Sequence, residues 1–148
     1  MNTLANRGFT QPASIIAPSV ADAAALVGRI LLALLFLKSG WGKVGGFEQT
    51  AAMMASKGVP LANIALIVTI LLELGGGLLL VIGYKARWVG LAFALWLIPV
   101  TLMFHAYWNV PADQVMNQSN NFFKNVSIFG GMLMVFAFGP GRYSVDRA

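Results

Sequence analysis

The chain has 148 residues, of which 58% are hydrophobic and 10% are charged, and its formal net charge is +5. Soluble domains carry about a quarter charged residues, so this composition excludes an ordinary soluble domain and predicts a membrane protein. The basic residues stand at the ends of apolar runs and form no patch, which argues against a nucleic-acid partner. The absence of cysteine excludes thiolate chemistry, disulfide exchange and cysteine-bound clusters or haem.

The first 22 residues are interrupted by Pro12, Pro18 and several polar side chains. A cleavable signal peptide needs an unbroken apolar core, which this stretch lacks. We therefore expect residues 1–22 to form a short cytoplasmic tail, with the first span acting as the targeting signal. Residues 23–148 should then form a single transmembrane domain.

Apolar runs follow at about residues 24–44, 61–83, 86–108 and 122–139. Each approaches the ~20 residues that a helix needs to cross ~30 Å of hydrocarbon. The alternation of period two that marks a membrane β-barrel is absent. The sequence thus predicts an all-α fold, an integral membrane four-helix bundle with up-down topology.

The connections between these runs differ in character. Residues 45–60 carry Phe47, Ala51 and Met54 at helical spacing and predict a short helix at the membrane interface. The turn at residues 83–87 is tight, so the second and third spans should form an antiparallel hairpin.

The orientation follows from the distribution of lysine and arginine. Both termini and the turn at residues 83–87 share one side, which carries more of these residues than the loops at 45–60 and 109–121. We therefore expect both termini in the cytoplasm and both loops outside.

Short patterns of glycine, charged and amide residues follow one another along the spans in a defined order. They are Gly28-Arg29, Phe36-Leu37, Ser39-Gly40, Lys43, Gly58-Val59-Pro60, Glu73-Leu74-Gly75-Gly76-Gly77, Asn121-Phe122-Phe123-Lys124-Asn125, Gly130-Gly131 and Gly139-Pro140-Gly141-Arg142-Tyr143-Ser144-Val145-Asp146. In this order and spacing, the chain resembles the DoxX family of small bacterial and archaeal membrane proteins over about residues 26–146.

This resemblance implies a multi-pass protein of the bacterial inner membrane. The family takes its name from subunits associated with quinone-linked respiratory and sulfur oxidation complexes. By resemblance, the chain is expected to be an accessory subunit of a redox system linked to quinone, sulfur or oxidative stress. Quinone would be its ligand, and lipid, redox proteins or a second copy of the chain would be its partners.

Glu73 is the most informative single residue, because it lies near the middle of an apolar span. A carboxylate at bilayer depth is costly and requires a partner or a function. Arg29 enters the first span from the same side, so we expect an Arg29–Glu73 ion pair inside the bundle. The pair would be either a structural lock or a site for protons or a quinone hydroxyl. Four glycines are expected to let helices pack closely: Gly40, Gly76, Gly77 and Gly131.

A second polar group is expected at the outer level of the bundle, as a pocket for an anion or a quinone head group. Its members are Lys43, His105, Asn121, Lys124 and Asn125. The alternative is that the two lysines only extend to the lipid head groups.

One histidine cannot by itself hold a haem or a metal ion, so we expect no intrinsic metal site or cofactor. The sequence therefore favours a protein without catalysis of its own and leaves membership of an oxidoreductase complex open. Two other functions also fit, namely transport of a small anion or weak acid and a membrane scaffold without a ligand.

Overall fold

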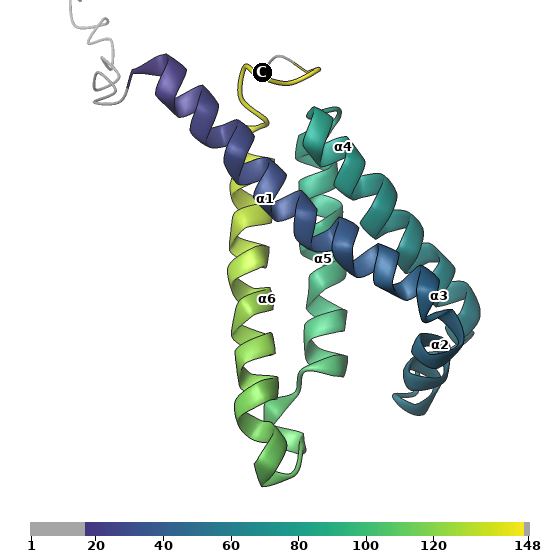
Figure 1. Cartoon of the computed structure of the whole chain (residues 1–148). Helices are drawn as coiled ribbons and strands as arrows, with labels where there is room; N and C mark the ends of the chain where they lie inside the picture. Colours follow the sequence, from purple (N-terminus) through teal and green to yellow (C-terminus); the bar gives the residue numbers. More distant parts are fainter. Residues whose placement is uncertain (1–16, 147–148) are drawn as a thin grey trace, which may run out of the picture.

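The computed structural model describes residues 17–146, and these residues form helices joined by short turns, with no strand among them (Figure 1). The elements are α1 (Pro18–Gly45), α2 (Phe47–Ser56), α3 (Ala62–Leu71), the π-helix η1 (Leu72–Gly76), α4 (Gly77–Ile82), α5 (Ala86–Phe104), the 3-10 helix η2 (Tyr107–Asn109) and α6 (Ala112–Phe138). Four helical units are long and apolar enough to cross a membrane: α1, α3 with η1 and α4, α5 with η2, and α6. The predicted all-α fold with four spans is confirmed.

Two helices begin earlier than the apolar runs indicated. Helix α1 starts at Pro18, inside the expected tail, because a proline at the first helical position gives up an N–H that has no helical partner anyway. Helix α6 starts at Ala112, so most of the polar stretch at residues 109–121 is helical instead of a loop. Hydropathy marks only the apolar part of a helix, and polar turns can extend beyond it. Residues 1–16 of the expected tail lie outside the described range.

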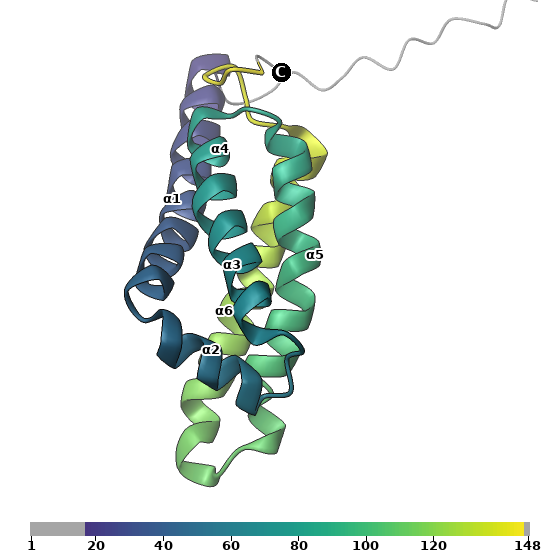
Figure 2. The same ribbon diagram turned by 90° about the vertical axis from the view of Figure 1, so that its right-hand side faces the viewer.

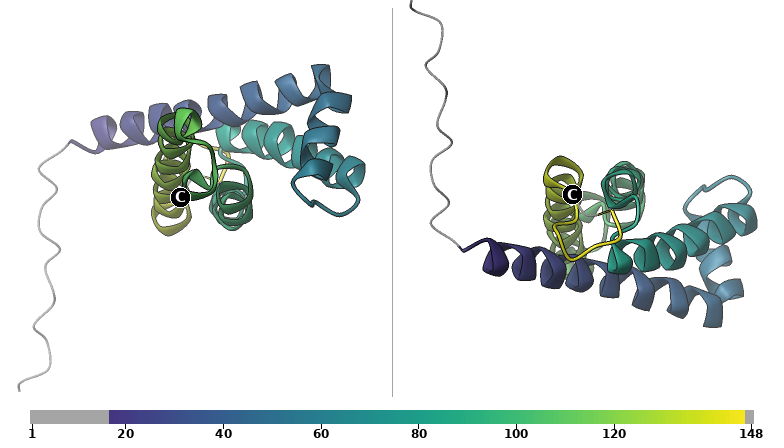
Figure 3. Two further views of the ribbon diagram at one scale, coloured as in Figure 1. Left: turned by 90° about the horizontal axis from the view of Figure 1, so that it is seen from below. Right: turned by 90° about the horizontal axis from the view of Figure 1, so that it is seen from above.

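The helices form two arms. Helix α1 packs along α3, η1 and α4, and α5 packs along α6 (Figure 2). The first arm is strongly inclined to the second, as the end-on views show (Figure 3). Helix α2 packs against α1 and α3, and its backbone does not contact α5 or α6. The arms therefore meet closely at the end that holds the C-terminal segment and diverge towards α2.

The core lies where the two arms meet. Phe36 of α1 stacks on Phe93 of α5 with ring centroids 3.9 Å apart. Around them lie buried aliphatic residues from four elements: Ala33, Leu80, Val89, Leu97, Ile128, Met132 and Val135. A smaller cluster joins Ala51 and Met54 of α2 to Leu66 of α3. The helix expected at residues 45–60 is thus present, and its apolar face covers α3.

Glycines lie at the closest helix contacts. A Cβ atom at Gly76 would lie 2.9 Å from the ring of Phe93, and one at Gly77 would lie 2.8 Å from Leu37. The other two glycines assigned to packing are similarly placed, Gly40 against Leu74 and Gly131 against Leu32. Gly90 was not singled out from the sequence. Among the glycines, it is the one that lies closest to the main chain of another helix, α6. A Cβ there would lie 3.0 Å from the carbonyl oxygen of Met132.

Arg29 does not pair with Glu73, which corrects the expected ion pair. Its guanidinium donates hydrogen bonds to the carbonyl oxygens of Pro140, of Tyr143 at 2.8 Å and of Val81 at 3.3 Å. Arg29 is only 2% exposed. It therefore holds the segment after α6 against the end of α4.

The same C-terminal segment makes further bonds across this end of the bundle. The backbone N–H groups of Val145 and Asp146 donate to the carbonyls of Ile82 and Gly83 at 3.0 and 3.2 Å. The Asp146 carboxylate accepts the N–H of Ala86, the first residue of α5, at 3.2 Å. An anion at a helix N-terminus is stabilising. The Asp146 carboxylate therefore fixes the C-terminal segment to the start of α5.

Replacing Gly90 by alanine should destabilise the protein, because the main chain of α6 cannot move aside as a side chain could. We expect the Gly90→Ala variant to lose about 1–3 kcal/mol of unfolding free energy. The matched control is Gly130→Ala in α6, where no atom lies within 4 Å of the added methyl group. The control should be neutral or gain up to about 1 kcal/mol from helix propensity. Thermal unfolding in detergent compares the two, and equal midpoints would contradict the packing of α5 on α6.

Replacing Arg29 by methionine should release the C-terminal segment without affecting Glu73. Hydrogen bonds to charged groups contribute about 1.5–3 kcal/mol, so the amides of Val145 and Asp146 should exchange about 10- to 100-fold faster. Hydrogen–deuterium exchange measures this directly. Arg142→Gln, a change at an exposed arginine of the same segment, is the control and should leave the exchange unchanged.

Candidate functional site

The register of α1 against the second span decides the partner of Glu73. Gly77 lies against Leu37 and Gly40 lies against Leu74, so the two segments run antiparallel with Glu73 beside Gly40. Arg29 precedes Gly40 by eleven residues, which is about 16 Å along a helix. That distance is beyond the reach of an arginine side chain that is already held by three carbonyl groups. The expected pair was wrong because the depth of each residue in its own span does not fix this register.

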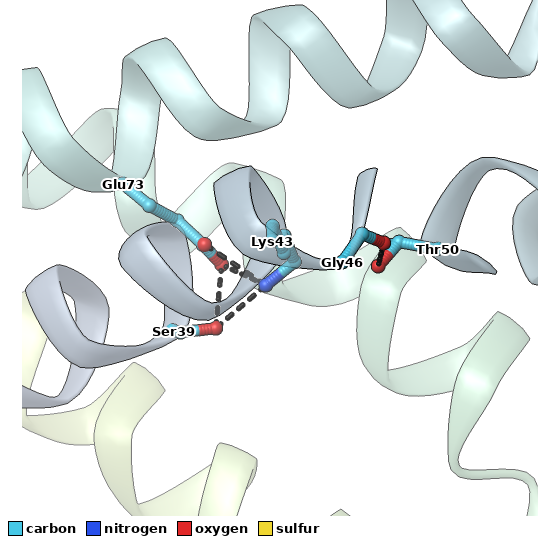
Figure 4. A network of polar contacts seen from close by, with 5 residues as sticks. All are labelled: Ser39, Lys43, Gly46, Thr50 and Glu73. Atoms are coloured by element: carbon cyan, nitrogen blue, oxygen red, sulfur yellow. Dashed lines mark hydrogen bonds and ion pairs between the residues drawn. The ribbon is translucent and has the colours of Figure 1, made fainter. Parts of the chain in front are cut away.

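Lys43 is the partner that the register supplies. Its Nζ atom lies 2.9 Å from both carboxylate oxygens of Glu73 (Figure 4). The Ser39 hydroxyl completes the group, accepting from Lys43 at 2.6 Å and donating to Glu73 at 3.2 Å. Glu73 is 2% exposed, whereas the Lys43 side chain is 24% exposed. The Glu73 carboxylate is therefore enclosed by protein, whereas the Lys43 side chain is partly accessible from outside.

The backbone around Glu73 is a single π-helical stretch, η1, with α-helix on both sides. A π turn accommodates one extra residue and is frequent at functional sites. Gly76 and Gly77 are buried against different neighbours, Phe93 of α5 and Leu37 of α1. The turn that follows Glu73 therefore packs on both arms.

A cavity of about 410 Å³ opens beside this ion pair, between the diverging arms. Its walls are mainly apolar and aromatic: Leu35, Phe36, Met53, Met54, Trp96, Leu97, Val100, Phe104 and Ile128. Its polar lining comes from every helical unit: Ser39, Lys43, Thr50, Lys57, Thr69, Glu73, His105, Gln118, Lys124 and Asn125. The cavity can hold a flat apolar molecule, and its polar side chains can form hydrogen bonds with the polar substituents of that molecule.

The structure brings together most of the residues expected in an outer pocket. Lys43, His105, Lys124 and Asn125 all line the cavity. Asn121 does not line it, but its amide oxygen accepts a hydrogen bond from Lys124 at 2.8 Å. Lys43 also belongs to the Glu73 group, so the two polar layers inferred from the sequence are one connected site. Across residues 17–146, no three His, Asp or Glu side chains gather closely enough to hold a metal ion.

The sequence analysis missed several lining residues, each for a local reason. Lys57 lies just after α2, and the direction in which α2 packs could not be read from a segment that short. Gln118 was placed in a loop, whereas it is helical and contacts His105 at 2.9 Å. Trp96 was recognisable as an aromatic residue in mid-span, and its position three residues after Phe93 in α5 places it near the core.

Breaking the Lys43–Glu73 pair from one side should be strongly destabilising, because it leaves a buried carboxylate without its counter-ion. We expect Lys43→Met to lower the unfolding free energy by about 3 kcal/mol. The double variant Lys43→Met/Glu73→Leu should regain most of that loss, since neither charge is then left alone. Lys38→Met, at an exposed lysine of the same helix, is the control. Denaturant unfolding in micelles measures all three, and a Lys43→Met variant as stable as the control would contradict the pair.

Comparison with known proteins identifies the family. A family model described as DoxX matches residues 24–106, more than half of the chain. The inner membrane protein YqjF of Escherichia coli K12 is 38% identical over 85% of this chain and 92% of its own length. The inner membrane protein YphA of the same organism is 35% identical over 82% of this chain and 87% of its own.

A Surfeit locus protein 4 homolog of Schizosaccharomyces pombe is 28% identical over 82% of this chain, but over only 36% of its own length. No solved structure matches the chain. The four membrane-spanning units and the inner membrane relatives agree on a multi-pass inner membrane protein. The chain belongs to the DoxX family.

Proposed function

We propose that this protein is an accessory membrane subunit of a quinone-linked redox system, and that its cavity holds the quinone ring. The observation that carries the proposal is the cavity itself, an apolar and aromatic space that ends on the Ser39–Lys43–Glu73 group. Small-molecule pockets occupy about 300–1,000 Å³ and combine apolar walls with a few polar groups. The volume of about 410 Å³ falls within that range.

The chemistry of the lining suits a quinone. A quinone ring is flat and carries carbonyl oxygens that accept hydrogen bonds. The Asn125 amide supplies such a donor on α6, whereas the three N–H groups of Lys43 already bond to Ser39 and Glu73. Phe36 and Trp96, with ring centroids 6.3 Å apart, contribute aromatic rings to the wall of the same cavity. Glu73 and Ser39 hold the Lys43 ammonium at the wall of this space.

An accessory role follows from the residues available for electron transfer. The chain contains no cysteine and one histidine, so ligands for a redox metal would have to come from a partner protein. The protein is therefore proposed to hold or present quinone, and a partner oxidoreductase to supply the redox reaction.

Transport of an anion or weak acid is the second candidate, and the lysines in the cavity wall favour it. The packing favours binding instead. Phe36 separates the cavity from the core, where it stacks on Phe93, and Ala33, Leu80 and Met132 fill the bundle beyond. A cavity that ends on a packed core can bind a ligand as it stands, whereas transport would require a second conformation that opens the packed side. A scaffold without a ligand would not require the cavity.

Filling the cavity should abolish quinone binding. Val100 lines the cavity on α5, and Val100→Phe would place a ring in it without touching the ion pair. We expect menadione to bind to the purified protein in nanodiscs and to bind at least about tenfold more weakly to this variant, since a filled site cannot also hold the ring. Leu95→Phe is the matched control, because Leu95 is 59% exposed.

The same pair of variants tests the cellular role. Deletion of the protein should lower quinol-dependent oxygen consumption, and the Leu95→Phe variant should restore it while Val100→Phe should not. If wild-type protein binds no menadione, or if both variants bind it equally, the cavity is not a quinone site.

A further inference from the structure

Two lysines at the mouth of the cavity form no ion pair with any of the described residues, 17–146. Lys57 lies just after α2 and Lys124 lies in α6, and both are exposed where they line the cavity. Within residues 17–146 the ion pair formed is Lys43–Glu73, and Glu73 is the acidic residue of the cavity wall. Lys124 donates to the neutral amide of Asn121 at 2.8 Å. The pair cancels its own charge, so the mouth retains the two positive charges of Lys57 and Lys124.

These charges come from the two different arms. Lys57 follows α2, which packs on α1 and α3, whereas Lys124 belongs to the α5–α6 arm. The backbone of α2 makes no contact with α5 or α6, and the cavity lined by both lysines therefore lies between the arms. Lys57 and Lys124 therefore line the same cavity from different arms. Like charges facing one site raise its affinity for an anion, and low-dielectric walls strengthen that field.

The deeper part of the cavity has the opposite character. Its ion pair is already balanced, and the walls around it are apolar and aromatic. An anion would gain little there, because Lys43 is neutralised by Glu73, but an uncharged ring would fit. The site is therefore polarised along its length, with an apolar interior and a cationic mouth.

We infer that the cavity prefers an aromatic or quinoid acid, whose ring occupies the apolar interior while its carboxylate-class group lies between Lys57 and Lys124. This rests on the proposed function, since it assumes that the cavity holds a ring, and it adds the charge of the ligand. The other use of such lysines is contact with lipid phosphates. In that case their charge would not affect the choice of ligand.

The test compares two naphthoquinones of similar size with opposite electrostatics. Menadione is neutral, and 1,4-naphthoquinone-2-sulfonate carries a permanent negative charge. Binding is measured by equilibrium dialysis against the full chain in nanodiscs of phosphatidylcholine, with empty nanodiscs correcting for partition into lipid. The zwitterionic lipid keeps anionic head groups away from the mouth. We expect the sulfonate to bind about tenfold more tightly than menadione, a factor within reach of two partly exposed charge pairs.

Charge variants assign the preference to the mouth. In Lys57→Gln/Lys124→Gln the two naphthoquinones should bind equally, within about twofold, because the attractive charges are gone. The matched control is Lys38→Gln/Lys85→Gln, which removes two exposed lysines that do not line the cavity and should keep the full preference. Raising the salt concentration from about 0.05 to 0.5 M should weaken the preference in the wild-type protein, which tests the inference even if a variant folds poorly.

The outcomes separate the two proposals. If menadione binds but the sulfonate binds no more tightly, the inference of an acidic ligand fails and the quinone pocket stands. The inference also fails if the preference survives the loss of Lys57 and Lys124 or is insensitive to salt. If neither molecule binds to the wild-type protein, the proposed function fails together with it.

Discussion

The buried carboxylate of Glu73 is the constraint around which the rest of the bundle is arranged. An isolated ion in an apolar interior is prohibitively unfavourable, so Glu73 needs a counter-ion at its own level. Lys43 and Ser39 meet that need only if α1 passes close to η1, and Gly40 makes this approach possible. A Cβ at Gly40 would lie 2.9 Å from Leu74 and 3.1 Å from the Cβ of Glu73. The charge and the close packing therefore enforce the same register of α1 on the second span.

That register has consequences at both ends of the bundle. Towards the C-terminal segment, it sets Arg29 beside Val81 and Gly83, where its guanidinium donates to the carbonyls of Pro140 and Tyr143 in the returning chain. Towards α2, it sets Lys43 at the edge of the space between the arms. Arg29 and Lys43 of α1 thus have different roles, because Arg29 closes the bundle and Lys43 belongs to the site. Arg29 cannot take the place of Lys43 as the partner of Glu73, because the register puts it at the other end of the bundle.

Composition and apolar runs were sufficient to predict the four membrane-spanning helices, because every span must satisfy its backbone internally and cover itself with apolar side chains. They also singled out Glu73, and the glycines of the second span, as buried. They could not identify the partner of Glu73, since Arg29 and Lys43 both lie on α1 and only the register of two helices distinguishes them. Gly90 looked like any other glycine in an apolar run until the main chain of α6 was seen against it. The start of α6 was misplaced because polar turns of a helix carry no hydropathy signal.

The cavity is a consequence of the same geometry. Because the first arm is inclined to the second (Figure 3), the helices do not pack along their whole length. The cavity left between them is lined by residues of every helical unit. The bundle places its balanced pair at the inner end of this space and its unbalanced lysines at the mouth. Mutual repulsion between Lys57 and Lys124 would be reduced by moving either charge elsewhere on the surface. The proposed anionic group would lie between them and contact both arms at the level where the backbone of α2 does not reach α5 or α6. Ligand binding and closure of the open end of the bundle are thus expected to stabilise each other.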